Sequence, residues 1–223
     1  MQASFTYYRQ ISLRKASLQV MISRLMELLA PTSCLGCGRE GAVLCTTCID
    51  LYGRDTPPLR PDAPVLSGIS VGAYYDGPVK ELILLFKFHR LRAATEAAAE
   101  LIVRRAAEWP VIDVITSVPV SPSRHRERGY NQSELIARTV AKRTGLPYHP
   151  TLIRLTATHQ IGLDRQSRFK QVAGAFRAVR PVAGHRVLIV DDVVTTGATL
   201  VECASELRTA GARDVWAAAV ARH

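Results

Sequence analysis

The segment from residue 187 to residue 199, VLIVDDVVTTGAT, constrains the fold of this chain more than any other. Its apolar, β-branched start predicts a buried strand that ends in Asp191 and Asp192 and leads through a Thr/Gly loop into a helix. In open α/β sheets, ligands bind beyond the carboxyl ends of the strands, where this segment lies. Two carboxylates repel phosphate, so we expect them to accept hydrogen bonds from hydroxyl groups, such as those of a ribose, or to hold a cation.

The loop after the acid pair is suited to phosphate binding. Gly197 permits close approach of the backbone, and residues 195–199 offer N–H groups and threonine hydroxyls beside the positive end of the next helix. Apolar strands that end in aspartate also occur in Walker B segments and response regulators. The chain has no G-x-x-x-x-G-K-[ST] motif, which argues against a P-loop NTPase.

The remainder of the chain from about residue 68 alternates between strand and helix patterns. Strands are predicted at 70–75, 111–118, 152–155, 186–190 and 215–220, and helices at 78–86, 93–109, 132–144 and 199–209. Asn131 is a plausible N-cap with Glu134 in capping-box position. The alternation predicts an α/β fold with a mainly parallel sheet covered on both faces. Residues 156–175 show no period and are expected to form a long functional loop.

Four cysteines form two CxxC pairs: Cys34, Cys37, Cys45 and Cys48. Four thiolates favour tetrahedral Zn²⁺ and leave no coordination position for water, so we predict a structural zinc site. A redox CxxC is the alternative. Gly36 and Gly38 are expected to supply the positive φ angles of the turn. Free thiols in paired sets also favour a reduced compartment, and hence a cytoplasmic location.

These patterns divide the chain into four segments. We predict a basic N-terminal extension at 1–24, a four-cysteine zinc-binding module of the zinc-ribbon type at 25–57, a Pro-rich linker at 58–67 and an α/β domain at 68–223. The composition of 1–24 resembles a transit peptide, but a dispensable extension or an over-long start also fits, and we favour the last. No apolar run approaches the roughly 18 residues that span a bilayer, so no membrane span is expected.

The net charge of +10 is concentrated in two windows besides the N-terminal extension. Residues 124–143 hold six basic against two acidic residues, and 154–180 hold six against one. The first window places three arginines directly after the strand at 111–118, namely Arg124, Arg126 and Arg128. Such localised charge indicates an anion-binding surface, with a solvated basic face or contact with a nucleic-acid backbone as the alternatives.

The segment 187–199 resembles the PRPP-binding motif of the type I phosphoribosyltransferases. The resemblance implies a Rossmann-like parallel-sheet core in which Asp191 and Asp192 hold the ribose hydroxyls. The residues implied for the 5-phosphate are Thr195, Thr196, Gly197, Ala198 and Thr199. The pyrophosphate loop corresponds to Arg124, Arg126, Arg128, Gly129 and Asn131. The family's flexible loop corresponds to the stretch with Arg165, Arg168 and Lys170, of which Arg168 is the predicted ligand-binding residue.

A wider resemblance covers about residues 25–222. The cysteine pairs, followed by Val118-Pro-Val, by RERGYNQ at 126–132 and by Gln160 to Phe176, are similar to the ComF/ComFC family associated with DNA uptake. One departure is Gln171, where the family usually has Asn.

The resemblance implies a Mg²⁺-dependent phosphoribosyltransferase that moves phosphoribosyl from PRPP to a nitrogen nucleophile and releases pyrophosphate. The alternative is a non-catalytic, PRPP-responsive protein that handles single-stranded DNA with other competence proteins, with Tyr130 or Phe169 stacking on bases. We expect any hood that selects the acceptor to come from residues 25–110, including Lys87, Phe88 and His89.

Overall fold

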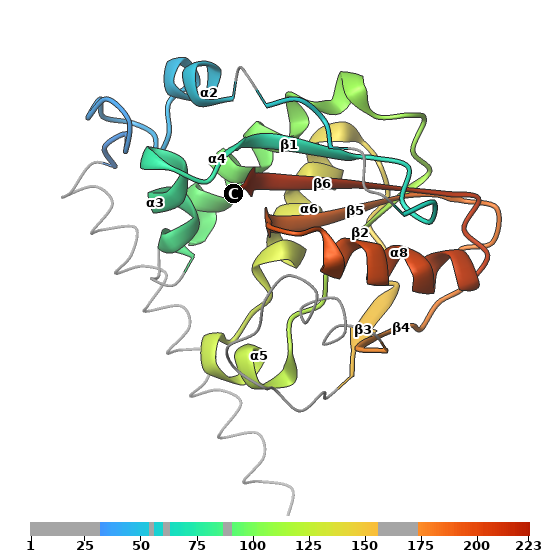
Figure 1. Ribbon diagram of the computed structural model, residues 1–223. Coiled ribbons are helices and arrows are strands. Elements are labelled where there is room, and N and C mark those ends of the chain that lie inside the picture. The colour runs from blue at the N-terminus through green and yellow to red at the C-terminus, as the bar shows by residue number, and fades with distance from the viewer. Residues whose placement is uncertain (1–31, 54–55, 60–62, 87–90, 156–173) are drawn as a thin grey trace, which may run out of the picture.

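The computed structural model describes residues 32–53, 56–59, 63–86, 91–155 and 174–223. Its central feature is a four-stranded sheet in the order β1-β6-β5-β2 (Figure 1). The strands are β1 (Ile69–Tyr74), β2 (Val114–Ser117), β5 (Arg186–Val194) and β6 (Asp214–Arg222). Neighbouring strands in this sheet all run parallel. The predicted α/β fold with a parallel sheet is confirmed.

Helices cover both faces of the sheet, on opposite sides in Figure 1. They are α3 (Gly77–Leu85), α4 (Leu91–Val103), α6 (Gln132–Thr144) and α8 (Ala198–Thr209). Alternate residues of β5 enter two separate cores: Leu188 and Val190 pack on the α4 and α6 side, and Val187 and Ile189 on the α8 side. All four side chains are fully buried. A strand covered on both faces has to be apolar throughout, which explains the unbroken run in the sequence.

The strand that carries the acid pair is longer than its sequence pattern predicts. Instead of ending at Val190, β5 continues through both aspartates to Val194. It does so because β6 pairs with it along the whole length, with Asp191 opposite Ala219 and Val194 opposite Arg222. The last strand is extended for the same reason and covers 214–222 instead of 215–220. Pairing with a neighbour fixes both acids at the carboxyl edge.

The predicted helix at 93–109 is shorter in the structure. It ends at Val103 and is followed by a 3₁₀ turn, η1 (Ala106–Glu108). Trp109 Nε1 donates to Ser70 Oγ on β1 at 2.7 Å, which holds the chain on the sheet instead of continuing the helix. The helical composition of the segment is overridden by this tertiary contact.

Three short elements were not predicted: α2 (Thr46–Tyr52), α5 (Pro122–Arg128) and β4 (Phe176–Ala178). The last pairs antiparallel with β3 (Leu152–Arg154), which matches the strand predicted at 152–155. Elements of three to seven residues show too little of a period to be recognised in sequence.

The cysteine-bearing segment packs on the sheet domain. Ile49 of α2 lies in the same buried core as Leu101 and Ile102 of α4. Arg104, which directly follows α4, forms ion pairs with Asp50 of α2 and with Glu100 of α4. The small module therefore shares a hydrophobic core with α4.

The predicted linker also contacts the sheet. Leu59 and Ile69 exchange backbone hydrogen bonds of 2.7 and 2.9 Å, and Ser67 N donates to the Val215 carbonyl at 2.9 Å. The predicted extension at 1–24 lies outside the described residues. In the part of the chain that the structure describes, no helix has the length and apolar character needed to cross a bilayer.

Candidate functional site

The candidate site lies at the carboxyl edge of the sheet, where β2 ends beside the last residues of β5. The two strands pair from Val114 opposite Val187 to Ser117 opposite Val190. Just beyond the strand, Val118 N donates to the Val190 carbonyl at 3.0 Å. Parallel pairing therefore brings the segment after β2 next to the acid pair, although about 70 residues separate them in the sequence.

Asp191 is a buried carboxylate held by two donors. Its Oδ1 accepts from Ser133 Oγ at 2.8 Å and from the Asp192 backbone N–H at 2.9 Å. Burial raises the pKa of Asp191, and the adjacent charge of Asp192 raises it further, while the bond from Ser133 opposes the shift. The site thus holds a desolvated acid that gains from a ligand rich in hydrogen-bond donors.

Asp192 is more open to solvent than Asp191. Its Oδ1 accepts from Val193 N at 2.7 Å. Burial raises the pKa of Asp192 as well, and the hydrogen bond from Val193 N and the positive charge of Arg128 oppose the rise. Because that charge acts on the Asp192 carboxylate, the α5 arginine lies within electrostatic range of the acid pair.

The Thr/Gly loop forms the start of α8. Gly197 is the N-cap residue, with a φ of 77°, and is buried. Ala198 N lies 3.4 Å from Thr196 Oγ1, and the exposed Thr195 precedes it. The first N–H groups of a helix have no partner within the helix, and they carry its positive dipole end. The loop residues 195–199 are therefore placed where they can donate to an anion next to the acid pair.

The three arginines at the start of the first basic window lie on a helix, α5, instead of in the expected loop. Ser121 caps α5, accepting from Arg124 N at 3.4 Å, and Gly129 ends it with a φ of 78°. Arg124 and Arg126 are exposed and Arg128 is partly buried. Among the described residues, none of these three arginines forms an ion pair. They present uncompensated positive charge at the same edge as the acids.

Asn131 occupies the predicted N-cap position of α6, but its side chain makes no capping bond. Its Nδ2 instead donates to the Val118 carbonyl at 3.0 Å, and Glu134 pairs with Arg138 at 2.9 Å. The predicted capping box is therefore wrong. This hydrogen bond connects the start of α6 to the segment between β2 and α5.

Two residues near the acids were not predicted from the sequence as part of the site. Ser133 is the hydroxyl partner of Asp191. Arg154 on β3 is half-buried, with its Cζ 5.2 Å from the centroid of the Phe176 ring. Burial lowers the pKa of Arg154, as does the charge of Arg124, whereas Asp191 raises it. The signal available in the sequence was only that Arg154 opens the second basic window.

Several predicted residues lie outside the described part of the chain. These are Lys87, Phe88, His89, Arg165, Arg168, Lys170 and Gln171.

A depression of about 640 Å³ lies at the opposite, amino edge of the sheet. Its wall includes Asp113 and Arg186, which are joined by hydrogen bonds of 2.9 and 3.1 Å. The bonds from Arg186 lower the pKa of Asp113 to about 2. The opposite charges of Asp113 and Arg186 neutralise each other, whereas Asp191 and Asp192 at the carboxyl edge are both acidic.

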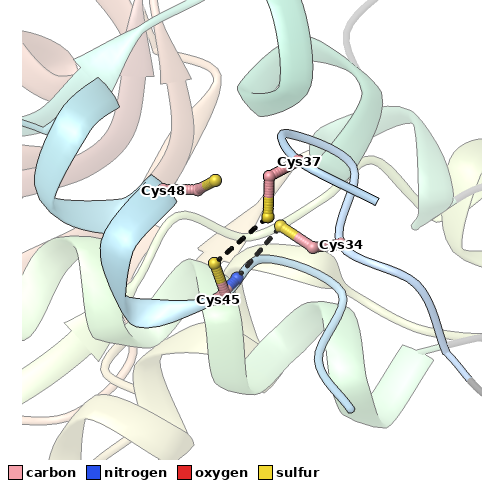
Figure 2. A group of neighbouring side chains, drawn as sticks. All are labelled: Cys34, Cys37, Cys45 and Cys48. Atoms are coloured by element: carbon pink, nitrogen blue, oxygen red, sulfur yellow. Dashed lines mark hydrogen bonds between the residues drawn. The ribbon is translucent and has the colours of Figure 1, made fainter. Parts of the chain in front are cut away.

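The four cysteines converge at one point beside α2 (Figure 2). Their sulfur atoms all lie within 4.8 Å of one another, and the Sγ atoms of Cys37 and Cys45 are 3.7 Å apart. Tetrahedral zinc with bonds of about 2.3 Å places its sulfurs about 3.8 Å apart. The cluster can therefore hold a metal ion after small side-chain adjustments.

The backbone around the cluster favours thiolate at two positions, because it lowers the pKa of Cys45 as well as that of Cys34. Burial would raise the pKa of Cys34, but N–H groups of Cys45, Cys37 and Gly36 outweigh it and lower that pKa to about 6. Burial raises the pKa of Cys48 to about 12, and the neighbouring thiols add to the rise. A cation at the centre would lower the pKa of all four thiols together.

The two glycines of the first cysteine turn have different roles. Gly38 has a φ of 74°, as predicted, whereas Gly36 does not have a positive φ. A Cβ on Gly36 would lie 2.7 Å from Cys48 Sγ. Gly36 is thus required by the close approach of the fourth sulfur rather than by its own backbone conformation.

Comparison with known proteins agrees with this fold. Residues 94–223 match the family model described as phosphoribosyl transferase domain. DNA utilization protein YhgH of Salmonella typhi is 35% identical over 195 residues, which cover 82% of this chain and 85% of that protein. Competence protein F of Haemophilus influenzae is 26% identical over 205 residues, or 85% of this chain and 90% of that protein.

Among solved structures, glutamine PRPP amidotransferase from B. subtilis aligns with a TM-score of 0.44 and 28% identity, covering 62% of this chain and 30% of that one. The family model covers more than half of the chain, and the sheet defines a type I phosphoribosyltransferase fold. Within that class, the chain belongs to the ComF/ComFC family, as its sequence predicted.

Proposed function

We propose that the chain binds PRPP together with Mg²⁺ and transfers its phosphoribosyl group to a nitrogen nucleophile, with release of pyrophosphate. One observation carries the proposal: a desolvated acid pair near the carboxyl end of β5 lies between the start of α8 and the arginines of α5. This arrangement offers acceptors, an anion-binding helix start and free cations, which match the hydroxyls, the 5-phosphate and the pyrophosphate of PRPP.

In this proposal the acid pair binds the ribose. The Oδ1 atoms of Asp191 and Asp192 already accept protein hydrogen bonds. The bonds from Ser133 Oγ, Asp192 N and Val193 N all go to Oδ1 atoms, which leaves the Oδ2 atoms for a ligand. Those oxygens would accept from the 2- and 3-hydroxyls and would stabilise positive charge that develops on the sugar during reaction.

The 5-phosphate would lie against residues 195–199 and the start of α8, where Gly197 allows the backbone to approach it closely. The pyrophosphate would lie toward Arg124, Arg126 and Arg128, with Gly129 and Asn131 shaping that segment. Arginine forks bind phosphate oxygens in pairs and remain charged at all relevant pH values. From the family resemblance, we propose Arg168 as a further residue that binds the ligand.

The reaction exchanges one bond at the anomeric carbon. The bond from that carbon to the pyrophosphate oxygen breaks, and its electron pair leaves with pyrophosphate. The lone pair of the nucleophile forms the new C–N bond, and the nitrogen loses its proton to water. Orientation and charge placement by this chain's residues supply the catalysis. Oxygen donors such as the Asp192 carboxylate suit Mg²⁺, which would neutralise charge on the departing pyrophosphate.

For the cysteine cluster we propose structural zinc. The four sulfurs converge at a spacing close to that of a tetrahedral thiolate site. Such a site leaves no coordination position for a substrate, so its contribution is to the folding of residues 32–53 against α4. The free thiols also favour a reduced compartment, and we propose the cytoplasm.

Calorimetric titration of PRPP with Mg²⁺ into the full chain tests the ribose assignment. We expect Asp192→Asn to weaken binding by about tenfold or more, because a charged acceptor is lost. Asp113→Asn is the matched control, since it removes a carboxylate at the opposite edge of the sheet. Equal PRPP affinity for wild type and Asp192→Asn would refute the assignment.

A second function is supported by the uncompensated arginines of α5 and by relatives named for DNA utilization and competence. In this alternative, the chain responds to PRPP without turnover and handles single-stranded DNA together with other competence proteins. Oligonucleotide binding that falls steeply with salt, with no pyrophosphate release from PRPP with any base or amine, would favour it. Pyrophosphate release that depends on an added nucleophile would favour the transferase.

A further inference from the structure

Ser133 lies in the first turn of α6, on the face of the helix that packs against the sheet. The buried residues of α6 include Ser133, Ile136, Ala137 and Val140, whose spacing places them on one face of the helix. The three apolar side chains are fully buried, and Ser133 is 6% exposed. A hydroxyl group buried in this way costs free energy unless it forms a hydrogen bond. The partner of Ser133 is therefore part of the reason for its position.

The partner of Ser133 is a carboxylate of the acid pair. Ser133 Oγ donates to Asp191 Oδ1 at 2.8 Å, and Asp191 is itself 9% exposed. Ile136 and Ala137 lie in the same hydrophobic core as Val190, the residue directly before Asp191. Packing of α6 on β5 therefore holds the serine hydroxyl at a fixed place beside the buried acid.

The two acids are held in different ways. The Oδ1 atom of Asp191 accepts from Ser133 Oγ and, at 2.9 Å, from the Asp192 backbone N–H. The Oδ1 atom of Asp192 accepts from the Val193 backbone N–H at 2.7 Å. The last side-chain torsion of an aspartate is broad, so hydrogen bonds decide the orientation of its carboxylate. Two donors from separate segments fix Oδ1 of Asp191, and the direction of its Oδ2 atom follows from that.

The arginines of α5 are connected to the same end of α6 by a separate contact. Three residues, 129–131, separate α5 from α6, and the last of them is Asn131. Its Nδ2 donates to the Val118 carbonyl at 3.0 Å. The start of α6 is thus bonded to the segment after β2 by Asn131 and to β5 by Ser133. Removal of the Ser133 hydroxyl leaves the Asn131 bond beside the arginine segment in place.

We infer that Ser133 is a positioning residue for the sugar: by holding Oδ1 of Asp191, it directs Oδ2 toward the ribose hydroxyls. Ser133 acts through the carboxylate and does not itself contact the ligand. The inference rests on the proposed function, because it takes the acid pair to bind the ribose of PRPP. Pyrophosphate alone has no hydroxyls to donate to Asp191, so its binding should not depend on Ser133.

The test is calorimetric titration of the full chain with PRPP and, separately, with inorganic pyrophosphate, each in the presence of Mg²⁺. We expect Ser133→Ala to weaken PRPP binding by about fivefold, the effect of one hydrogen bond, and to leave pyrophosphate binding unchanged. Thr139→Val is the matched control, because it removes a hydroxyl that donates to the Leu135 carbonyl within the same helix. It should leave both affinities unchanged. Pyrophosphate binding also reports that the variants are folded.

The outcomes separate this inference from the proposed function. Equal PRPP affinity of wild type and Ser133→Ala refutes the positioning role of Ser133, while the PRPP site stands. Equal losses of PRPP and pyrophosphate affinity in Ser133→Ala also overturn that role, because a bond that only supports the local fold would give this result. The same holds if Thr139→Val weakens PRPP binding as much as Ser133→Ala does. If the wild type does not bind PRPP, the proposed function fails, and the role of Ser133 fails with it.

Discussion

Replacing Asp191 by Asn should stabilise the ligand-free protein while removing its affinity for PRPP. The carboxylate is buried, and the aspartate next to it raises its pKa further, so its charge is unfavourable in the folded state. An asparagine Oδ1 can still accept from Ser133 Oγ and from the Asp192 N–H, so both native bonds survive. Its new N–H₂ group can donate toward the Asp192 carboxylate, which removes the repulsion within the pair.

The sign of the pH dependence follows from the raised pKa of Asp191. Between the ordinary carboxyl pKa and the raised one, the folded protein binds more protons at this site than the unfolded chain does. Stability due to this group therefore falls as pH rises through that window. A pKa that differs by one between the folded and unfolded states corresponds to about 1.4 kcal/mol. We expect Asp191→Asn to raise the free energy of unfolding by about 1 to 3 kcal/mol near pH 8, and by less near pH 5.

The assay is urea unfolding of wild type and variant from about pH 5 to about pH 8, with PRPP titration in parallel. Asp113→Asn is a control of opposite sign, because Arg186 lowers the pKa of Asp113 to about 2. That variant should be less stable than wild type at every pH tested. A gap between wild type and Asp191→Asn that stays constant or narrows as pH rises would refute the reasoning, as would a variant less stable than wild type at pH 8.

Substitutions at Gly36, Gly197 and Arg154 test other parts of the structure. Gly36→Ala should reduce the zinc bound per chain, measured by mass spectrometry of the metal, because its Cβ would lie 2.7 Å from Cys48 Sγ; full zinc content would contradict the tetrad geometry. Gly197→Ala and its control Gly184→Ala both place a side chain at a φ near 75°, so each should lower the free energy of unfolding in urea by about 1 kcal/mol. Only Gly197→Ala should weaken PRPP binding in calorimetry. Arg154→Gln should weaken PRPP binding several-fold and leave the circular dichroism spectrum unchanged. The reason is that Arg154 is half-buried, has no ion pair among the described residues and lies within electrostatic range of Asp191. Unchanged PRPP affinity would show that Arg154 only packs on Phe176.

Local chemistry made several features of this protein predictable from its sequence. The cysteine spacing predicts the cluster because two residues between cysteines let one turn present both sulfurs, and the structure brings all four together. The apolar run before Asp191 predicts a strand covered on both faces, because only such a strand has no polar positions. Helix α6 has the predicted bounds because its apolar period is clear and Gly145 ends it with a φ of 74°.

Other features depend on contacts between distant segments and have no local signature. The acids lie inside β5 only because β6 pairs with that strand to its end. Ser133 meets Asp191 across 58 residues, and Asn131 turns from its predicted cap to the end of β2. The hydrogen bond from Arg222 Nη2 to Tyr74 Oη joins β6 to β1 across 148 residues of sequence. A periodic sequence pattern shows which face of a helix or strand is buried. It does not show which segments meet at the carboxyl edge, because that depends on the order of the strands, and packing of the whole sheet decides the strand order.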